Sequence, residues 1–290
     1  MAVMALSELW LSSRGDRDRR VMRASFVSAI LAADFALSIT HLHSQLFIIR
    51  RPMSCPSSPF ALVHIIRHGE AVHNVQRGYP HRDPPLTEAG VQATKEIKLS
   101  TSPDLIIISP MTRTIQTAIN IFPCLQQAGT FAVPVQIWPD LREANDAICN
   151  KGLNQRDIQS KFPQFDFSAC HEEWDYPNHT IQDATARSER VRRRLQDLST
   201  TFKNIVIISH RGLIAYLVKG RRFSPSEARS YRFATDTEAQ DEEVRRGLHC
   251  DVLQDHDFGP TVLLLYNKLD EDQSSILSNP SIIPGTSEAS

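Results

Sequence analysis

The cysteines of this 290-residue chain form no CxxC pair, and their number is odd. A disulfide-stabilised secreted domain carries an even, closely spaced set, and paired cysteines are typical of zinc and redox sites. The histidines likewise lack the HxxxH or Cys-His spacing of a metal site. The sequence therefore favours a reducing compartment and predicts no metal ligand. The cysteines are Cys55, Cys124, Cys149, Cys170 and Cys250.

The chain also lacks an excess of charge, because 32 basic side chains face 33 acidic ones and the formal net charge is −1. This balance excludes a general attraction to nucleic acid or to acidic membrane surfaces, so no nucleic-acid partner is expected. One local basic run, Arg190 with Arg192, Arg193 and Arg194, falls on an amphipathic stretch. We interpret it as the solvated face of a helix, with nucleic-acid binding as the minor alternative.

Residues 1–52 lack an uninterrupted apolar run of the roughly 20 residues that a membrane helix needs. The stretch from residue 24 to residue 49 is broken by Asp34, His41 and His43, so no stable membrane span is expected. Arginines before it leave a mitochondrial presequence as the alternative to a cytoplasmic location, although acidic residues count against it.

The ends of the chain differ from its centre. We predict that residues 1–52 are a poorly structured extension, non-native or targeting, and that the working protein begins near Met53. Residues 53–268 are expected to form one domain, with a cap inserted at about 144–179. Residues 269–290, rich in Ser and Pro, are predicted to be a disordered tail.

Short apolar runs alternate with amphipathic stretches between the two ends, and no internal repeat is present. The runs lack polar alternation, as expected for strands that are covered on both faces. This order predicts a three-layer α/β/α sandwich with a mainly parallel central sheet. The predicted strands are residues 61–67, 105–108, 133–138, 205–209 and 261–266. The predicted helices begin near residues 87, 109, 184 and 212, with a short one near 154–161. The charged segment 236–246 is predicted to be a mobile loop.

Two of the predicted strands end in a histidine that lies beside an arginine. Arg67-His68-Gly69-Glu70 ends the first, and Ser209-His210-Arg211-Gly212 ends the fourth. Ligands bind at the carboxyl ends of strands in an open α/β sheet, so one anionic site fed by both segments is expected. Arg113, in the first turn of a predicted helix, can join them. Arginine forks match phosphate oxygens, and a neutral histidine is a competent nucleophile toward phosphorus.

Five segments in this order resemble the histidine phosphatase superfamily, also called phosphoglycerate mutase-like, over roughly residues 60–268. The matching segments are Arg67-His68-Gly69-Glu70 with Asn74, residues 83–90 with Gln92-Ala93, residues 109–118, Leu141-Arg142-Glu143, and Ser209-His210-Arg211-Gly212. The resemblance implies a phosphoglycerate mutase-like fold. It also implies that no metal or cofactor is needed, because arginines and histidines supply the positive charge.

The resemblance also implies roles for individual residues. His68 is expected to be the nucleophile that becomes a phosphohistidine, while Arg67, Arg113 and His210 hold the phosphoryl oxygens. Glu143 is expected to protonate the leaving oxygen and later to activate water. Asn74 is expected to line the pocket, with Arg211 and Gly212 beside the phosphate.

Simpler interpretations stand beside some of these roles. Glu143 could be half of a surface ion pair, Asn74 could cap a turn, and His64 more often packs within its strand. His73 and His81 are interpreted as surface residues of the first loop, residues 69–85, which follows the first predicted strand.

The expected reaction is metal-independent hydrolysis of a small phosphomonoester. The segment 145–179 carries more acidic than basic side chains, which suits a second phosphate poorly. A phosphoglycerate mutase-type phosphotransferase is the first alternative, and a non-catalytic phosphate-binding regulator is the second. A small phosphorylated metabolite is the expected partner, whereas its identity and the oligomeric state cannot be predicted from the sequence.

Overall fold

The structure, a computed structural model, describes residues 60–267 except for 128, 130, 173 and 176–179. The predictions for residues 1–52, for a start near Met53 and for the tail 269–290 therefore lie outside the described residues. Within the described part of the chain, no helix is both long and apolar enough to cross a membrane.

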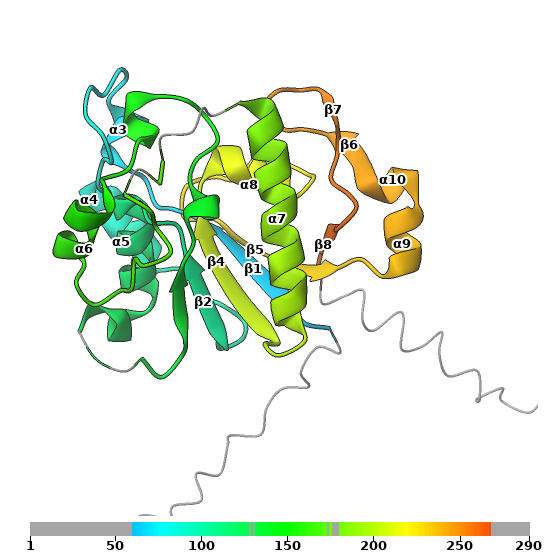
Figure 1. The fold of residues 1–290 in the computed structure, drawn as a ribbon, viewed down its shortest axis with the longest axis horizontal. Coiled ribbons are helices and arrows are strands. Elements are labelled where there is room, and N and C mark those ends of the chain that lie inside the picture. The colour runs from blue at the N-terminus through cyan, green and yellow to red at the C-terminus, as the bar shows by residue number, and fades with distance from the viewer. Residues whose placement is uncertain (1–59, 128, 130, 173, 176–179, 268–290) are drawn as a thin grey trace, which may run out of the picture. The chain divides into compact units, whose positions relative to one another are not determined.

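A six-stranded sheet is the centre of the fold, with strand order β3-β2-β4-β1-β5-β8 (Figure 1). The strands β3, β2, β4 and β1 are parallel, and β5 runs antiparallel to both of its neighbours. The strands are β1 (Leu62–Arg67), β2 (Leu105–Ile108), β3 (Val135–Ile137), β4 (Asn204–Ser209), β5 (Ala228–Phe233) and β8 (Leu263–Leu265); β6 (Arg246–Leu248) and β7 (Asp255–Asp257) form a separate pair. The predicted mainly parallel sheet is confirmed.

Helices cover both faces of this sheet, and successive strand residues point to opposite sides. Val63 and Ile65 of β1 belong to a buried cluster with Val191 of α7, whereas Ile66 belongs to a second cluster with Ile115 of α5. The three-layer sandwich is therefore confirmed. The helices are α3 (Val72–Val75), α4 (Glu88–Lys95), α5 (Thr112–Ile121), α6 (Gln155–Lys161), α7 (Ile181–Ser199), α8 (Arg211–Leu217), α9 (Asp236–Gln240) and α10 (Glu242–Arg245), with 3₁₀ turns at Pro123–Gln126, Pro139–Leu141 and Ile148–Asn150.

Local signals explain where some of these elements begin. Thr87 caps α4, because its hydroxyl accepts a hydrogen bond from the Gly90 N–H at 3.0 Å, as the sequence predicts. His64 packs within β1 as expected, with Nδ1 2.8 Å from the Ser230 hydroxyl and Nε2 3.1 Å from the Thr101 hydroxyl.

The segment 236–246 is not a loop, and that prediction is wrong. It forms α9 and α10 and enters β6. Thr235 and Glu238 form a capping box: the Thr235 hydroxyl accepts from the Glu238 N–H, and the Glu238 carboxylate accepts from the Thr235 N–H. This Thr-x-x-Glu spacing is a sequence signal for a helix start, and the high density of charge obscured it.

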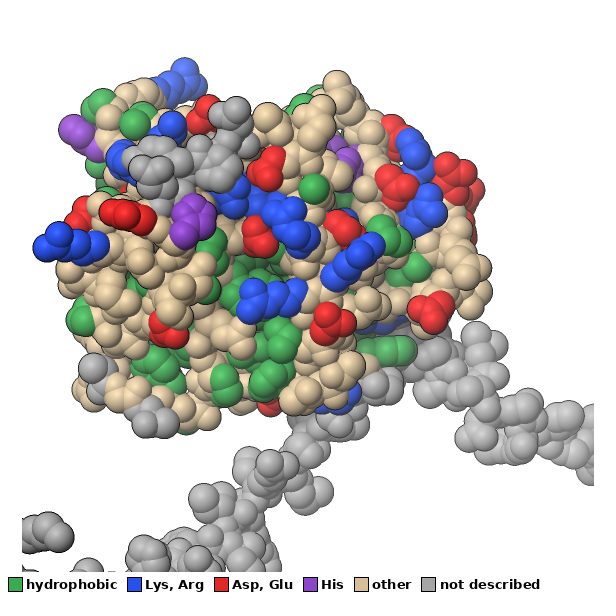
Figure 2. All heavy atoms as spheres, viewed as in Figure 1, with side chains coloured by type: hydrophobic (Ala, Val, Ile, Leu, Met, Phe, Trp, Pro, Cys, Tyr) green, Lys and Arg blue, Asp and Glu red, His purple; other side chains and the backbone are tan. Residues whose placement is uncertain are grey.

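The basic run on α7 is solvated only in part. Arg192 is 1% exposed and donates hydrogen bonds to the carbonyls of Tyr216 and Leu217, so it satisfies the last turn of α8. Arg193 points outward and pairs with Glu189 at 2.8 Å. Figure 2 shows basic and acidic side chains intermixed on the face that α7 covers. The prediction of a uniformly solvated arginine face is wrong for Arg192.

Candidate active site

The two strand-end histidines meet, as the sequence predicts. Strands β1 and β4 are paired so that their last residues, Arg67 and Ser209, lie opposite each other, and a histidine follows each strand. The ring centroids of His68 and His210 are 5.2 Å apart. Strand β2 lies on the other side of β4 and is followed by Ser109, whose hydroxyl is 2.8 Å from Nε2 of His210. The carboxyl ends of three parallel strands, β1, β4 and β2, therefore bring His68, His210 and Ser109 together in one site.

His68 has the tautomer that a nucleophile needs. Its Nδ1 lies 2.6 Å from the Gly69 carbonyl oxygen, which can only accept, so Nδ1 carries the proton and Nε2 keeps its lone pair. The side chain is buried, and burial is the main cause that holds the pKa of His68 well below 6.5. The positive charges of Arg113 and then Arg67 lower this pKa further. The ring is therefore neutral near pH 7.

His210 shares this environment. It is fully buried, and its pKa is also held well below 6.5, first by burial and then by Arg113 and His68. Its Nε2 contacts the Ser109 hydroxyl, which can donate or accept, whereas its Nδ1 has no hydrogen-bond partner among the described residues.

We expect the free energy of unfolding to fall as the pH drops below 6.5. The pKa values of His68 and His210 are lower in the folded chain than in the unfolded chain, so the unfolded chain binds more protons and stability rises with pH. Each histidine contributes a slope of up to about 1.4 kcal/mol per pH unit between its two pKa values. Urea unfolding of the wild type and of His68→Gln at pH 7, 6 and 5 measures this slope. The slope of the unfolding free energy with pH should be smaller in the variant by the contribution of one histidine. Equal slopes for both proteins would contradict the prediction.

Two buried arginines carry the positive charge of the site. Arg113 is fully buried in the first turn of α5 and donates to the Cys149 carbonyl at 3.1 Å and to the Asn150 side-chain oxygen at 3.2 Å. Arg67 donates to the Phe223 carbonyl at 2.8 Å. The Nε atoms of both arginines are buried without a hydrogen-bond partner among the described residues. Burial and then the charge of Arg211 lower the pKa of Arg67 to about 10, so it is still charged near pH 7.

Asp83 fixes the start of the helix that carries Arg113. Its carboxylate accepts from the Thr112 N–H at 2.8 Å and from the Thr112 hydroxyl. Burial raises the pKa of Asp83, whereas these hydrogen bonds and Arg113 oppose the rise. Asp83 thus positions Arg113 from a segment, residues 83–90, that does not itself follow a strand.

Glu143 follows the 3₁₀ turn Pro139–Leu141, packs against the first turn of α8 and is only 6% exposed. Its carboxylate accepts hydrogen bonds from the backbone N–H groups of Ala144 at 2.6 Å, Leu213 at 3.1 Å and Gly212 at 3.3 Å. The preceding Arg142 is also buried and pairs with Asp183 at 3.4 Å. The alternative of a surface ion pair is therefore wrong, and the backbone donors hold the Glu143 carboxylate in place.

Arg187 of α7 anchors the segment that carries Glu143, and sequence reasoning missed it. This fully buried guanidinium donates to the carbonyls of Arg142 at 2.6 Å, Glu143 at 3.2 Å and Asp140 at 3.2 Å. A sequence has no spacing rule for an arginine whose partners are distant carbonyls.

Gly69 and Gly212, which follow the two strand-end histidines, lie so close to other atoms of the protein that a larger residue would not fit. A Cβ on Gly212 would lie 2.3 Å from Oε1 of Glu143, and a Cβ on Gly69 would lie 2.5 Å from the Thr94 methyl group and 3.0 Å from the Gly90 carbonyl. Gly69 thus lets the loop pack on α4, and Gly212 makes room for the carboxylate. Their approach to a phosphate stays a prediction.

We expect Gly212→Ala to lower kcat about 100-fold, because the new methyl group displaces the Glu143 carboxylate and a misplacement of 1 Å can cost that much. KM for an aryl phosphate should change little. The matched control is Gly247→Ala in β6, where the added Cβ meets only the flexible Lys219 side chain at 3.1 Å. A kcat for Gly212→Ala within threefold of the control would contradict the prediction.

Asn74 caps a turn, which confirms its simpler interpretation. Its side-chain oxygen accepts from the Ala71 N–H at 2.9 Å, and its amide nitrogen is 3.2 Å from Nε2 of His73. Asn74 is exposed, and its contact with a substrate stays a prediction. The interpretation of His73 as a surface residue is wrong: it is half-buried, with its ring centroid 6.0 Å from that of His68. No spacing in the sequence indicated this.

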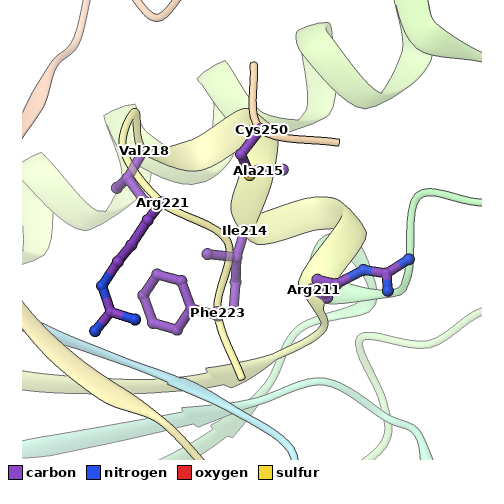
Figure 3. Close-up of a pocket in the computed structure, with 7 residues that line it drawn as sticks. All are labelled: Arg211, Ile214, Ala215, Val218, Arg221, Phe223 and Cys250. Atoms are coloured by element: carbon purple, nitrogen blue, oxygen red, sulfur yellow. The ribbon is translucent and has the colours of Figure 1, made fainter. Parts of the chain in front are cut away.

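Arg211 begins α8 at the edge of the site. It pairs at 3.3 Å with Asp251, which also pairs with Arg222 at 2.8 Å. Figure 3 shows Arg211 beside a small depression that is lined by Ile214, Phe223 and other side chains. This depression is too tight to admit a water molecule, so it is no substrate site. Among the described residues, no three His, Cys, Asp or Glu side chains are grouped to hold a metal ion.

Several known phosphatases are similar to this chain in sequence or structure. A probable phosphatase of Schizosaccharomyces pombe is 31% identical over 123 residues, which cover 40% of this chain and 56% of that protein. The adenosylcobalamin/alpha-ribazole phosphatase of Escherichia coli is 29% identical over 175 residues, which cover 57% of this chain and 80% of that protein. The alpha-ribazole phosphatase structure from Shigella flexneri is 22% identical, with a TM-score of 0.42, and the match covers 60% of this chain and 91% of that one.

The family comparison covers more than half of the chain. The profile of the histidine phosphatase superfamily (branch 1) matches residues 63–237, which include β1 from its second residue, β4, and the histidines His68 and His210 that follow these strands. This chain therefore belongs to the histidine phosphatase superfamily, branch 1.

Proposed function

We propose that the chain hydrolyses small phosphomonoesters through a phosphohistidine on His68. The observation that carries the proposal is the hydrogen bond from Nδ1 of His68 to the Gly69 carbonyl. It leaves a neutral Nε2 lone pair in a buried site beside the guanidinium groups of Arg67 and Arg113. These groups suit an anionic substrate, since they stabilise the charge that spreads over the phosphoryl oxygens in the transition state.

The first half-reaction transfers the phosphoryl group to the protein. The lone pair on Nε2 of His68 forms a bond to phosphorus while the ester P–O bond breaks, and the leaving oxygen takes a proton from the Glu143 carboxyl group. Arg67, Arg113 and His210 hold the equatorial oxygens. In the second half-reaction, water gives a proton to Glu143 and attacks phosphorus; the N–P bond breaks and phosphate leaves.

The first loop and the cap are the proposed source of substrate choice. They are joined, because the Asp83 N–H donates to the Lys151 carbonyl at 3.0 Å and Arg82 pairs with Asp175 at 3.5 Å. Arg82 also donates to the Gly152 carbonyl, so it serves to hold the cap on the loop. Residues 176–179 of the predicted cap lie outside the described residues.

Trapping of the phosphoenzyme tests this proposal. The protein is mixed with an aryl phosphate and a chelator at pH 5 to 8 and quenched in alkali, where phosphohistidine survives, and peptide mapping by mass spectrometry locates the phosphoryl group. We expect one phosphoryl group on His68 together with steady phosphate release. Phosphate release without modified His68 would overturn the mechanism. Phosphoglycerate isomerisation faster than phosphate release would favour a mutase, and phosphate binding without turnover would favour a regulator.

A further inference from the structure

His73 belongs to the short helix α3, which interrupts the first loop between β1 and α4, and it lies beside His68 although the proposed mechanism gives it no role. Its ring is tilted by 45° against that of His68, with 6.0 Å between centroids. The positive charges of Arg113, Arg67 and Arg211 lower the pKa of His73. His73 in turn lowers the pKa of His68 and of His210. The His73 ring therefore lies next to the proposed nucleophile and close enough to the site arginines for their charge to affect it.

The hydrogen bonds around Asn74 fix the tautomer of His73. The side-chain oxygen of Asn74 accepts from the Ala71 N–H, which can only donate, so the other Asn74 atom is the NH₂ group. That NH₂ group is 3.2 Å from Nε2 of His73 and cannot accept. Nε2 of His73 must therefore accept, and the proton of the neutral ring lies on Nδ1.

The Nδ1–H of His73 is a buried donor with no hydrogen-bond partner among the described residues. Such a donor is costly to bury, so a bound group that accepts from it is favoured. The nearby guanidinium groups only donate, so the partner that fits is an oxygen of an anion. The ring stays neutral while it donates: burial, then Arg113, Arg67 and Arg211, lower the pKa of His73 to about 3.

We propose that His73 is a further substrate-contacting residue, whose Nδ1–H donates to an oxygen of the phosphoryl group bound beside His68. Asn74 is then a positioning residue that acts through His73 and holds its tautomer. This inference rests on the proposed phosphate site.

Three variants separate the donor from the ring. His73→Phe keeps a flat ring without a donor, His73→Asn keeps an N–H near the Nδ1 position, and Asn74→Ala releases the tautomer. We expect His73→Phe to weaken the binding of inorganic phosphate about tenfold, which corresponds to about 1.4 kcal/mol. His73→Asn should stay within about threefold of the wild type, and Asn74→Ala should fall between them. The control His81→Phe changes an exposed histidine of the same loop and should bind as the wild type does.

Nitrogen NMR of ¹⁵N-histidine-labelled protein reads the tautomer directly, with His73→Phe providing the assignment. We expect His73 to be protonated at Nδ1 and neutral from pH 5 to 8, and its Nδ1 signal to move when inorganic phosphate is added. Protonation at Nε2, or signals of His68 and His210 that move while His73 does not, would overturn this inference alone. No movement of any of the three would overturn the proposed phosphate site as well.

Discussion

His68→Ala is expected to lower kcat for an aryl phosphate by about four orders of magnitude or more, because the variant has no nitrogen to form the phosphoenzyme. Phosphate binding should survive. Arg67 and Arg113 keep their own contacts to the Phe223 carbonyl and to Cys149 and Asn150, none of which involves the His68 ring. Loss of turnover with retained affinity is the signature of a nucleophile, whereas a misfolded site loses both.

Steady-state kinetics and isothermal titration with inorganic phosphate measure the two quantities. His171→Ala is the matched control, because His171 is an exposed histidine. It should keep both turnover and affinity. A phosphoenzyme that still forms in His68→Ala, or a kcat within tenfold of the control, would contradict the assignment of His68.

The sequence predicted the strands that are buried on both faces. The strands β1, β2 and β4 read as continuous apolar runs because helices cover each side of them, and their limits differ from the prediction by no more than a residue. Strand β5 was missed. Only Tyr231 of its six residues is buried, and its two arginines pair with Glu227 and Glu238. Its strand conformation is set by pairing with β1 and β8, which no local pattern shows.

The residues of the site also fall into those that the sequence could predict and those that it could not. His68 and His210 could be brought together from the sequence because each ends a strand and parallel strands share one edge. His73, Arg187 and Asp251 could not, because each owes its role to tertiary contacts: a ring beside His68, carbonyls near Glu143, and a pair of arginines. Buried arginines are the hardest to foresee, since their usual place is the surface.

Arg113→Met is expected to lower kcat/KM about 1000-fold, the size of effect found when a donor to a developing oxyanion is removed. It should also change the pH dependence. Arg113 is the largest electrostatic cause that lowers the pKa of both His68 and His210. Without its charge, the pKa of His68 moves back toward 6.5, so the nucleophile becomes protonated at a higher pH. The acid limb of the kcat/KM profile should therefore shift to higher pH.

Two further variants separate charge, geometry and burial. Arg113→Lys keeps a cation at the start of α5 but cannot fork, so it should lose kcat/KM with a smaller shift of the acid limb. Arg192→Met removes another buried arginine, which bonds the last turn of α8 and is not among the groups that lower the pKa of His68. It should destabilise the fold and leave the pH profile of kcat/KM in place. An equal shift in Arg192→Met and Arg113→Met would show that loss of packing, rather than loss of the Arg113 charge, moves the acid limb.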